Sequence, residues 1–157
     1  MRLLGVILDT SLSLNTHVKN VCRAAFYHTR TLRHIRPSLT EKMASSVACS
    51  LVQSRLDYAN SLYVGMSSAK FDALQRAQNT IARVVTLSPK RDHITLTLKR
   101  LHWLPVRQRV TYKIATLVYN IRRSRSHTIY TLFSRIILLL DISDEQIPRD
   151  SVCRELS

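Results

Sequence analysis

Apolar residues recur at steps of three and four positions along most of the chain, which is the spacing of a helix with one buried face. In the segment from Ser13 to Ile35, the positions on this face are Val18, Val21, Cys22, Ala25, Phe26, Leu32 and Ile35. Pro37 follows directly, and proline disfavours helical geometry in the residue before it. The pattern therefore predicts a long first helix that ends near Ile35.

A second helix is predicted between Ser38 and the break at Gly65. Ser38 and Glu41 have the spacing of a capping box, in which a hydroxyl and a carboxylate accept the free backbone N–H groups of a helix start. The buried seam of this helix is predicted to be the i, i+4 row formed by Met43, Val47 and Leu51.

Three shorter patterns predict three further helices. The third helix begins at Ser67–Ser68 and closes before Pro89, with an inward face of Phe71, Leu74, Ile81 and Val85. The fourth lies between Asp92, as its cap, and Arg100. The fifth has Pro105 at its first position, and its predicted inward residues are Val106, Val110, Ile114, Leu117 and Ile121.

The aliphatic run Leu3–Leu8 predicts a short buried strand, and Asp9–Ser11 a turn after it. A lone strand needs a partner, so we expect its natural sheet to lie outside this chain. Gly5 and Gly65 are the only glycines, which disfavours a fold rich in tight hairpins. The predicted fold class is mainly α: a helical bundle of about five helices with one short N-terminal strand.

One flank of the first predicted helix is cationic. At about 100° per residue, its basic residues fall together rather than around the helix; they are Lys19, Arg23, Arg30, Arg33 and His34. The chain has a net charge of +14, and 21 of its 24 Lys and Arg residues but only 5 of its 10 acidic residues precede position 127. A surface this basic attracts phosphates.

Cysteine usage and hydropathy bear on the compartment. Cys22, Cys49 and Cys153 contain no Cys-x-x-Cys pair, so neither a disulfide framework nor a zinc site is predicted. We expect an intracellular location, in the nucleus or cytoplasm. The N-terminal apolar run is broken at Asp9, which does not fit a signal peptide. Ile136–Leu140 is far shorter than the roughly 20 residues that cross a bilayer, so no membrane partner is expected.

Five blocks follow one another along the chain: Leu4–Ser13 with His17-Val18, Arg36–Leu39, Ser54–Leu62, Leu74–Arg83, and Lys90–Thr95 with Leu101–Val106. In order and spacing they resemble the reverse transcriptases of jockey-like and chicken-repeat-like LINE (non-LTR) retrotransposons. The first, Leu4–Ser13 followed by His17-Val18, is similar to the final palm strand and turn of that family. Arg36–Leu39 is similar to the start of its thumb region, and Ser54–Leu62 to the end of its long second helix. Leu74–Arg83 is similar to its Leu-Gln-x-x-Gln-Asn helix, and Lys90–Thr95 with Leu101–Val106 to its most distinctive downstream pair.

The resemblance implies a palm-like strand and turn at residues 1–12, a basic helical thumb-like domain at 13–125 and a divergent, poorly ordered tail at 126–157. After Asn120 the family's Leu-Asn-Gly-x-Ala-Pro-like turn is replaced by Ile121–Ser126. Family polymerases hold Mg²⁺ with a Tyr-x-Asp-Asp turn and a third aspartate; nothing here matches, and Asp9 lies after the catalytic strands. We therefore expect a truncated segment that is not an enzyme, without catalytic residues, metal ligands or cofactor.

The function implied by the resemblance is binding of RNA, DNA or an RNA–DNA hybrid template–primer through a basic helical surface. The residues expected to contact phosphates are Lys19, Arg23, Arg30, Arg33, Arg76, Arg83, Arg107 and Arg109. The alternative is a non-functional or repurposed helical scaffold, derived from a mobile element, that binds proteins or self-associates through exposed apolar faces.

Three aromatic residues and one acid have competing interpretations. Trp103, after His102, can stack on an unpaired base or fill the core before the proline-initiated helix, and we favour the core. Tyr58 and Tyr112 are predicted to be half-buried packing residues. Asp57 is predicted to form a local ion pair with the neighbouring Arg55 or to cap the next helix.

Overall fold

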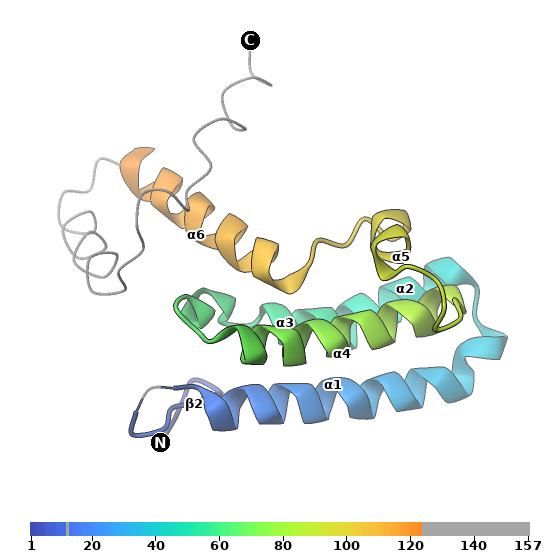
Figure 1. The fold of residues 1–157 in the computed structure, drawn as a ribbon, viewed down its shortest axis with the longest axis horizontal. Coiled ribbons are helices and arrows are strands. Elements are labelled where there is room, and N and C mark those ends of the chain that lie inside the picture. The colour runs from blue at the N-terminus through green and yellow to red at the C-terminus, as the bar shows by residue number, and fades with distance from the viewer. Residues whose placement is uncertain (12, 124–157) are drawn as a thin grey trace, which may run out of the picture.

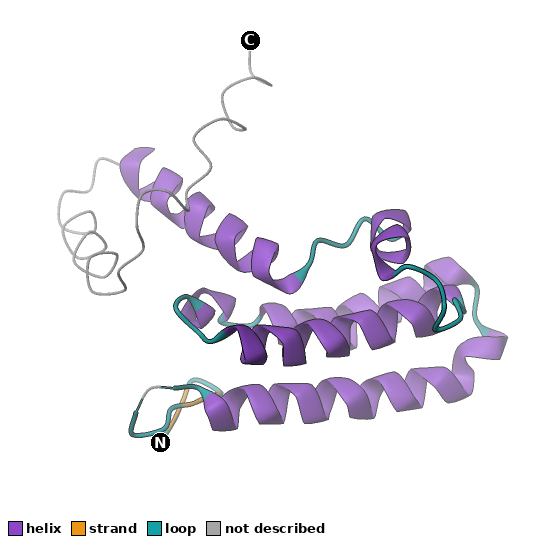
Figure 2. Cartoon of the chain, in the orientation of Figure 1, coloured by secondary structure: helices purple, strands orange, loops and turns teal. Residues whose placement is uncertain are grey.

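The computed structural model describes residues 1–11 and 13–123, most of them in helices (Figures 1 and 2). The helices are α1 (Asn15–Ile35), α2 (Glu41–Ala48), α3 (Ser54–Asp57), α4 (Ser68–Thr86), α5 (Ile94–Arg100) and α6 (Val106–Arg123). A π-helical segment, Cys49–Gln53, joins α2 to α3, so we refer to Glu41–Asp57 as the α2–α3 rod. The predicted bundle of about five helices is confirmed, whereas the predicted apolar run Ile136–Leu140 lies outside the described residues.

Helices α1 and α4 lie side by side and run in the same direction, and the α2–α3 rod returns against both (Figure 1). One hydrogen bond marks each end of the α1–α4 pair. Lys70 Nζ donates to the Ser13 carbonyl at the start, and Arg36 Nε donates to the Val85 carbonyl at 2.8 Å at the end. Helix α6 crosses α4 on the side away from α1.

Each of the three packed elements buries at least one alanine side chain among its larger core residues. Ala25 of α1, Ala44 and Ala48 of the rod, and Ala77 of α4 are at most 1% exposed. Helix axes come close where alanines meet, and larger side chains then fill the space on either side. The largest fully buried ones include Tyr63, Leu56, Leu74 and Ile81. On α4 the predicted inward face, Phe71, Leu74, Ile81 and Val85, is confirmed.

The predicted seam of the second helix is wrong by one position. Met43 and Leu51 are 52% and 39% exposed and Val47 is half-buried, whereas the core holds Ala44, Ala48, Val52 and Leu56. Both rows have a spacing of four, so periodicity alone did not separate them. Similarly, Phe26 and Ile35 of α1 were predicted inward but lie 42% and 47% exposed.

Helix starts differ from the predicted caps. The hydroxyl of Thr40, rather than Ser38, accepts the Met43 N–H at 3.3 Å, and the N-cap of α5 is His93 rather than Asp92. The Pro105 carbonyl accepts the first hydrogen bond of α6, from Arg109 N–H at 3.1 Å. Proline therefore precedes that helix instead of occupying its first position.

The start of α1 is held by Asp9. Its carboxylate accepts hydrogen bonds from the Ser13 N–H at 2.6 Å, the Ser13 hydroxyl at 2.6 Å and the Asn15 N–H at 3.2 Å. The bond from the Ser13 hydroxyl is the main reason that the pKa of Asp9 lies below its usual value. This aspartate thus organises the turn before α1.

The N-terminal aliphatic run forms a hairpin instead of the single buried strand that we predicted. Strands β1 (Arg2–Leu3) and β2 (Val6–Ile7) pair with each other in antiparallel fashion. Gly5 lies in the turn between the strands with a φ of 82°, a backbone conformation that residues with L side chains rarely adopt. The run therefore supplies its own partner, and only Val6 of the two strands is buried.

His17 joins this hairpin to the helices. The imidazole is buried on α1, where Nδ1 accepts the Ile7 N–H at 3.4 Å and Nε2 lies 3.4 Å from the Tyr63 hydroxyl. Burial lowers the pKa of His17 below its ordinary value of 6.5 and raises that of Tyr63 to about 12. The hairpin thus depends on a neutral histidine.

The corrected seam predicts opposite outcomes for neighbouring residues of the rod. Ala44→Leu or Ala48→Leu should lower the free energy of unfolding by about 1–3 kcal/mol, because the added methylenes have no room between packed helices. Met43→Ala and Leu51→Ala should each change it by less than about 1 kcal/mol. Urea unfolding followed by circular dichroism measures both, and a larger loss at Met43 than at Ala44 would restore the original seam.

The neutral state of His17 predicts acid sensitivity. Because its pKa is lower in the folded chain, the unfolded chain binds the proton first, so stability is full above about pH 6.5 and falls as the pH decreases below it. Burial also lowers the pKa of His28, which contributes in the same direction. His17→Gln should flatten the dependence of unfolding free energy on pH between 7.5 and 5.5; an unchanged slope would exclude His17 as the cause.

Candidate nucleic-acid interface

Helix α1 carries a row of free cations along one flank. Lys19, Arg23, Arg30 and Arg33 are all exposed and, within the described residues, none forms an ion pair. At a rise of about 1.5 Å per residue, the row extends over about 21 Å. We call these four residues the α1 cationic row. The four side chains share one flank because α1 is a single helix whose opposite face is buried against the rod and α4.

Helix α4 brings Arg76 close to Cys22 of α1. Burial raises the pKa of the Cys22 thiol, and the charge of Arg76 opposes that rise, so the guanidinium lies near α1. Arg76 is exposed, but Arg83 is half-buried and its Nη2 donates to the Asp92 carbonyl at 3.3 Å. The predicted pair on α4 thus divides into an arginine without an ion pair in the described part of the chain and one tied to the loop before α5.

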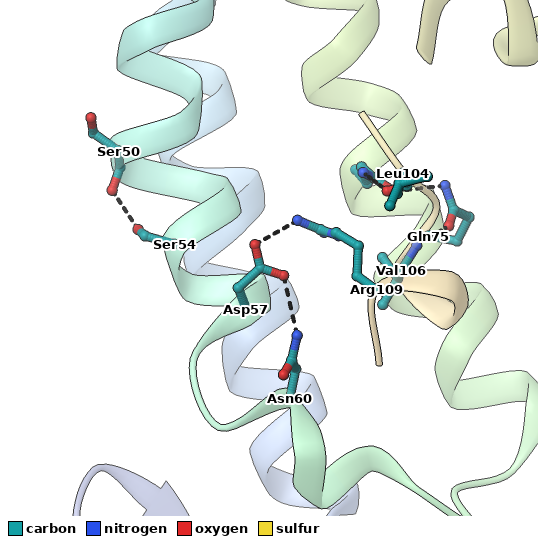
Figure 3. A network of polar contacts seen from close by, with 9 residues as sticks. Ser50, Ser54, Asp57, Asn60, Gln75, Leu104, Val106 and Arg109 are labelled. Carbon is teal, nitrogen blue, oxygen red and sulfur yellow. Dashed lines mark hydrogen bonds and ion pairs between the residues drawn. The ribbon is translucent and has the colours of Figure 1, made fainter. Parts of the chain in front are cut away.

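The two predicted arginines of α6 make contacts within the protein. Arg107 lies over the ring of Phe71, 4.7 Å from its centroid, in a cation–π arrangement. Arg109 Nη1 lies 2.7 Å from Asp57 Oδ2 (Figure 3). Asp57 therefore pairs with Arg109 across the fold, and the predicted local pair with Arg55 is wrong.

Burial dominates the electrostatics of the Asp57–Arg109 pair. It raises the pKa of Asp57, although Arg109 opposes the rise, and it lowers the pKa of Arg109, although Asp57 opposes the fall. Only 16% of the Arg109 side chain is exposed, against 42% for Asp57. The guanidinium is thus committed to the interior and has little surface left for a ligand.

A network of side-chain amides sets the position of α6 (Figure 3). Gln78 is fully buried and its Nε2 donates to the Leu104 carbonyl at 2.9 Å. Gln75 accepts the Val106 N–H at 2.9 Å and donates to Gln78 Oε1 at 3.0 Å. Two of the distinctive sequence blocks are therefore bound to each other: the amides of α4 satisfy the backbone of the turn that begins α6.

Arg36 was absent from the predicted site and has a structural role. It is 6% exposed, and in addition to its bond to Val85 its Nη1 donates to the Leu39 carbonyl at 2.7 Å. A cation at the last carbonyls of α4 also complements the helix dipole. Its position directly before Pro37, at a helix end, was the available sequence signal for a capping role.

The turn before α6 decides the role of Trp103. His102 adopts a left-handed backbone, and the Trp103 N–H closes α5 by donating to the Leu98 carbonyl at 2.9 Å. Trp103 is half-buried against the core, as favoured from the sequence. The packing prediction is confirmed for Tyr58, which is 53% exposed, has its ring next to Gly5 and donates its hydroxyl to the Leu4 carbonyl. It is wrong for Tyr112, which is 68% exposed.

Within residues 1–11 and 13–123, no group of three or more His, Cys, Asp or Glu side chains could hold a metal ion. No helix in the same part of the chain is long and apolar enough to cross a membrane. Comparisons with protein-family models, curated proteins and solved structures gave no match.

The buried amide of Gln78 yields a stability prediction. Gln78→Leu keeps the side-chain volume but leaves the Leu104 carbonyl without its donor, so the free energy of unfolding should fall by about 1–3 kcal/mol. Thr80→Ala is the matched control on α4, because Thr80 only bonds back to the Arg76 carbonyl; it should change stability by less than about 0.5 kcal/mol. Equal effects of the two substitutions in urea unfolding would contradict this role.

Proposed function

We propose that this domain binds the sugar–phosphate backbone of nucleic acid through the α1 cationic row and Arg76. The observation that carries the proposal is the row itself: four cations without acidic partners in the described structure, on one flank of a 21-residue helix. Such an arrangement presents several charges to one polyanion at once. Binding of this kind gives affinity and salt dependence but little sequence preference.

The wider proposal is a thumb-like segment of a non-LTR retrotransposon reverse transcriptase, which holds template–primer and does not itself polymerise. The five resembling blocks support it. Their structural use also supports it, because Arg36–Leu39 and Leu74–Arg83 with Leu101–Val106 provide the buried polar contacts that join the helices. The blocks belong together as parts of one packed unit.

The structure refines the residues that we propose as phosphate contacts. Lys19, Arg23, Arg30, Arg33 and Arg76 are exposed on adjoining helices, and none has an acidic partner among residues 1–11 and 13–123. Arg83 and Arg107 are already partly engaged within the protein, Arg83 by the Asp92 carbonyl and Arg107 by the Phe71 ring. We assign Arg109 to the interior, because its charge is matched by Asp57.

A second candidate function is protein binding by the outward apolar row of the α2–α3 rod. Met43 and Leu51 are exposed, and the half-buried Val47 lies between them on one line of the helix. An exposed apolar row of this kind fits an interaction surface. Self-association that depends on Leu51, together with weak nucleic-acid binding, would favour this function over the first.

Charge reversal tests the proposed interface. The double substitution Arg23→Glu and Arg30→Glu should weaken binding to a labelled RNA–DNA hybrid by roughly tenfold or more at 50 mM salt. Affinity should also fall less steeply with salt: the negative slope of log affinity against log salt should become shallower by about 2, because two phosphate contacts are lost. Fluorescence anisotropy at 50 and 200 mM salt measures both quantities.

The control for net charge is Lys42→Glu on the rod with Lys99→Glu on α5, two exposed residues without ion pairs in the described structure. It should leave most of the affinity intact, because the α1 cationic row is unchanged. Equal losses in the two double variants would show a diffuse charge effect and contradict a defined interface. Absence of binding by the unaltered chain at 50 mM salt would dismiss the proposed function.

A further inference from the structure

Two exposed aromatic side chains interrupt the α1 cationic row. Phe26 is 42% exposed and Tyr27 is 67% exposed, although aromatic side chains are usually covered in a folded protein. The Tyr27 ring meets His28 edge-on, with centroids 5.3 Å apart. Phe26 has no ring contact in the described structure. The core therefore does not use these rings, even though the apolar pattern suggested that it would use Phe26.

The order of charges and rings along the helix is regular. Lys19, Phe26 and Arg33 are seven residues apart, which places them on one line of α1 with the ring between two cations. On the neighbouring line, Tyr27 lies four residues after Arg23 and three before Arg30. Each exposed ring is thus bracketed by positive charges on both sides.

Alternating cations and rings suit a single strand better than a duplex. In a duplex the flat faces of the bases are stacked on one another, so a helix flank reaches mainly the phosphates and sugars. In a single strand both the phosphates and the faces of the bases are accessible, and aromatic side chains in a cationic groove stack on them. The rings on α1 would have no partner on a duplex.

We propose that this flank of α1 prefers single-stranded nucleic acid, with phosphates on the α1 cationic row and unpaired bases stacked on Phe26 and Tyr27. This inference rests on the proposed function and specifies its ligand as an unpaired strand rather than a paired hybrid. The fold supports it further, because the buried Ala25, Thr29 and Leu32 hold the opposite face and keep both rings outward.

The test uses the full chain and labelled oligonucleotides of one sequence: single-stranded RNA, single-stranded DNA and the RNA–DNA hybrid. Anisotropy should show tighter binding of either single strand than of the hybrid. Phe26→Ala with Tyr27→Ala should weaken single-strand binding by at least about fivefold, with the salt slope and the affinity for hybrid unchanged. Tyr112→Ala with Tyr119→Ala, which removes two exposed rings from α6, is the matched control and should change none of these.

A second variant reports the contact directly. Phe26→Trp places an indole on the row, and its fluorescence should be quenched by the single strand and not by the hybrid. The native Trp103, half-buried on another element, provides the background signal in the unaltered chain. This readout requires stacking and would not respond to a purely structural role of Phe26.

The outcomes separate the inference from the function on which it rests. Salt-dependent binding that tolerates loss of both rings, or that is equal for single strand and hybrid, would overturn the single-strand preference and leave the backbone interface standing. A wild-type dimer that Phe26→Ala with Tyr27→Ala converts to a monomer would also overturn it, because the rings would then bind protein. Loss of all salt-dependent binding would remove the proposed function itself.

Discussion

Close packing of three helical elements through alanine side chains is the constraint on which the rest of this structure depends. Ala25, Ala44, Ala48 and Ala77 are buried where α1, the α2–α3 rod and α4 meet. Because these side chains are small, the backbones approach closely and each helix can rotate little without a clash. The rotation of α1 in turn decides which of its residues face solvent, and with them the position of the cationic row.

Buried polar groups then define the connections between the helices. Arg36 reaches the carbonyl of Val85, His17 contacts both Ile7 and Tyr63, and Gln78 holds the carbonyl of Leu104. A buried polar group without a partner costs stability, so these contacts favour one arrangement over other compact ones. They also explain why several polar residues of the distinctive sequence blocks lie in the interior rather than at a ligand site.

The cations of this basic chain fall into two groups with different physical roles. Arg36 donates to two carbonyl oxygens and Arg109 pairs through Nη1 with the Asp57 carboxylate, so their charge is used within the fold. Lys19, Arg23 and Arg30 have no such partner in the described residues and share a rigid helix flank. The helix backbone that carries these charges is already ordered. Binding of a polyanion to this flank would therefore cost the entropy of the side chains but not that of the backbone.

The sequence by itself determined the helical class, the position of most helices, the inward face of α4 and the clustering of charge on α1, because these follow from local periodicity and proline positions. It did not distinguish Met43 from Ala44 as the seam, and it placed Phe26 inside and Arg109 at the surface. The first two assignments depend on how closely a neighbouring helix approaches. The third depends on Asp57, the partner of Arg109, which lies 52 residues from it in the sequence. Only the tertiary structure decides them, because burial and ion pairing are properties of residues brought together by packing.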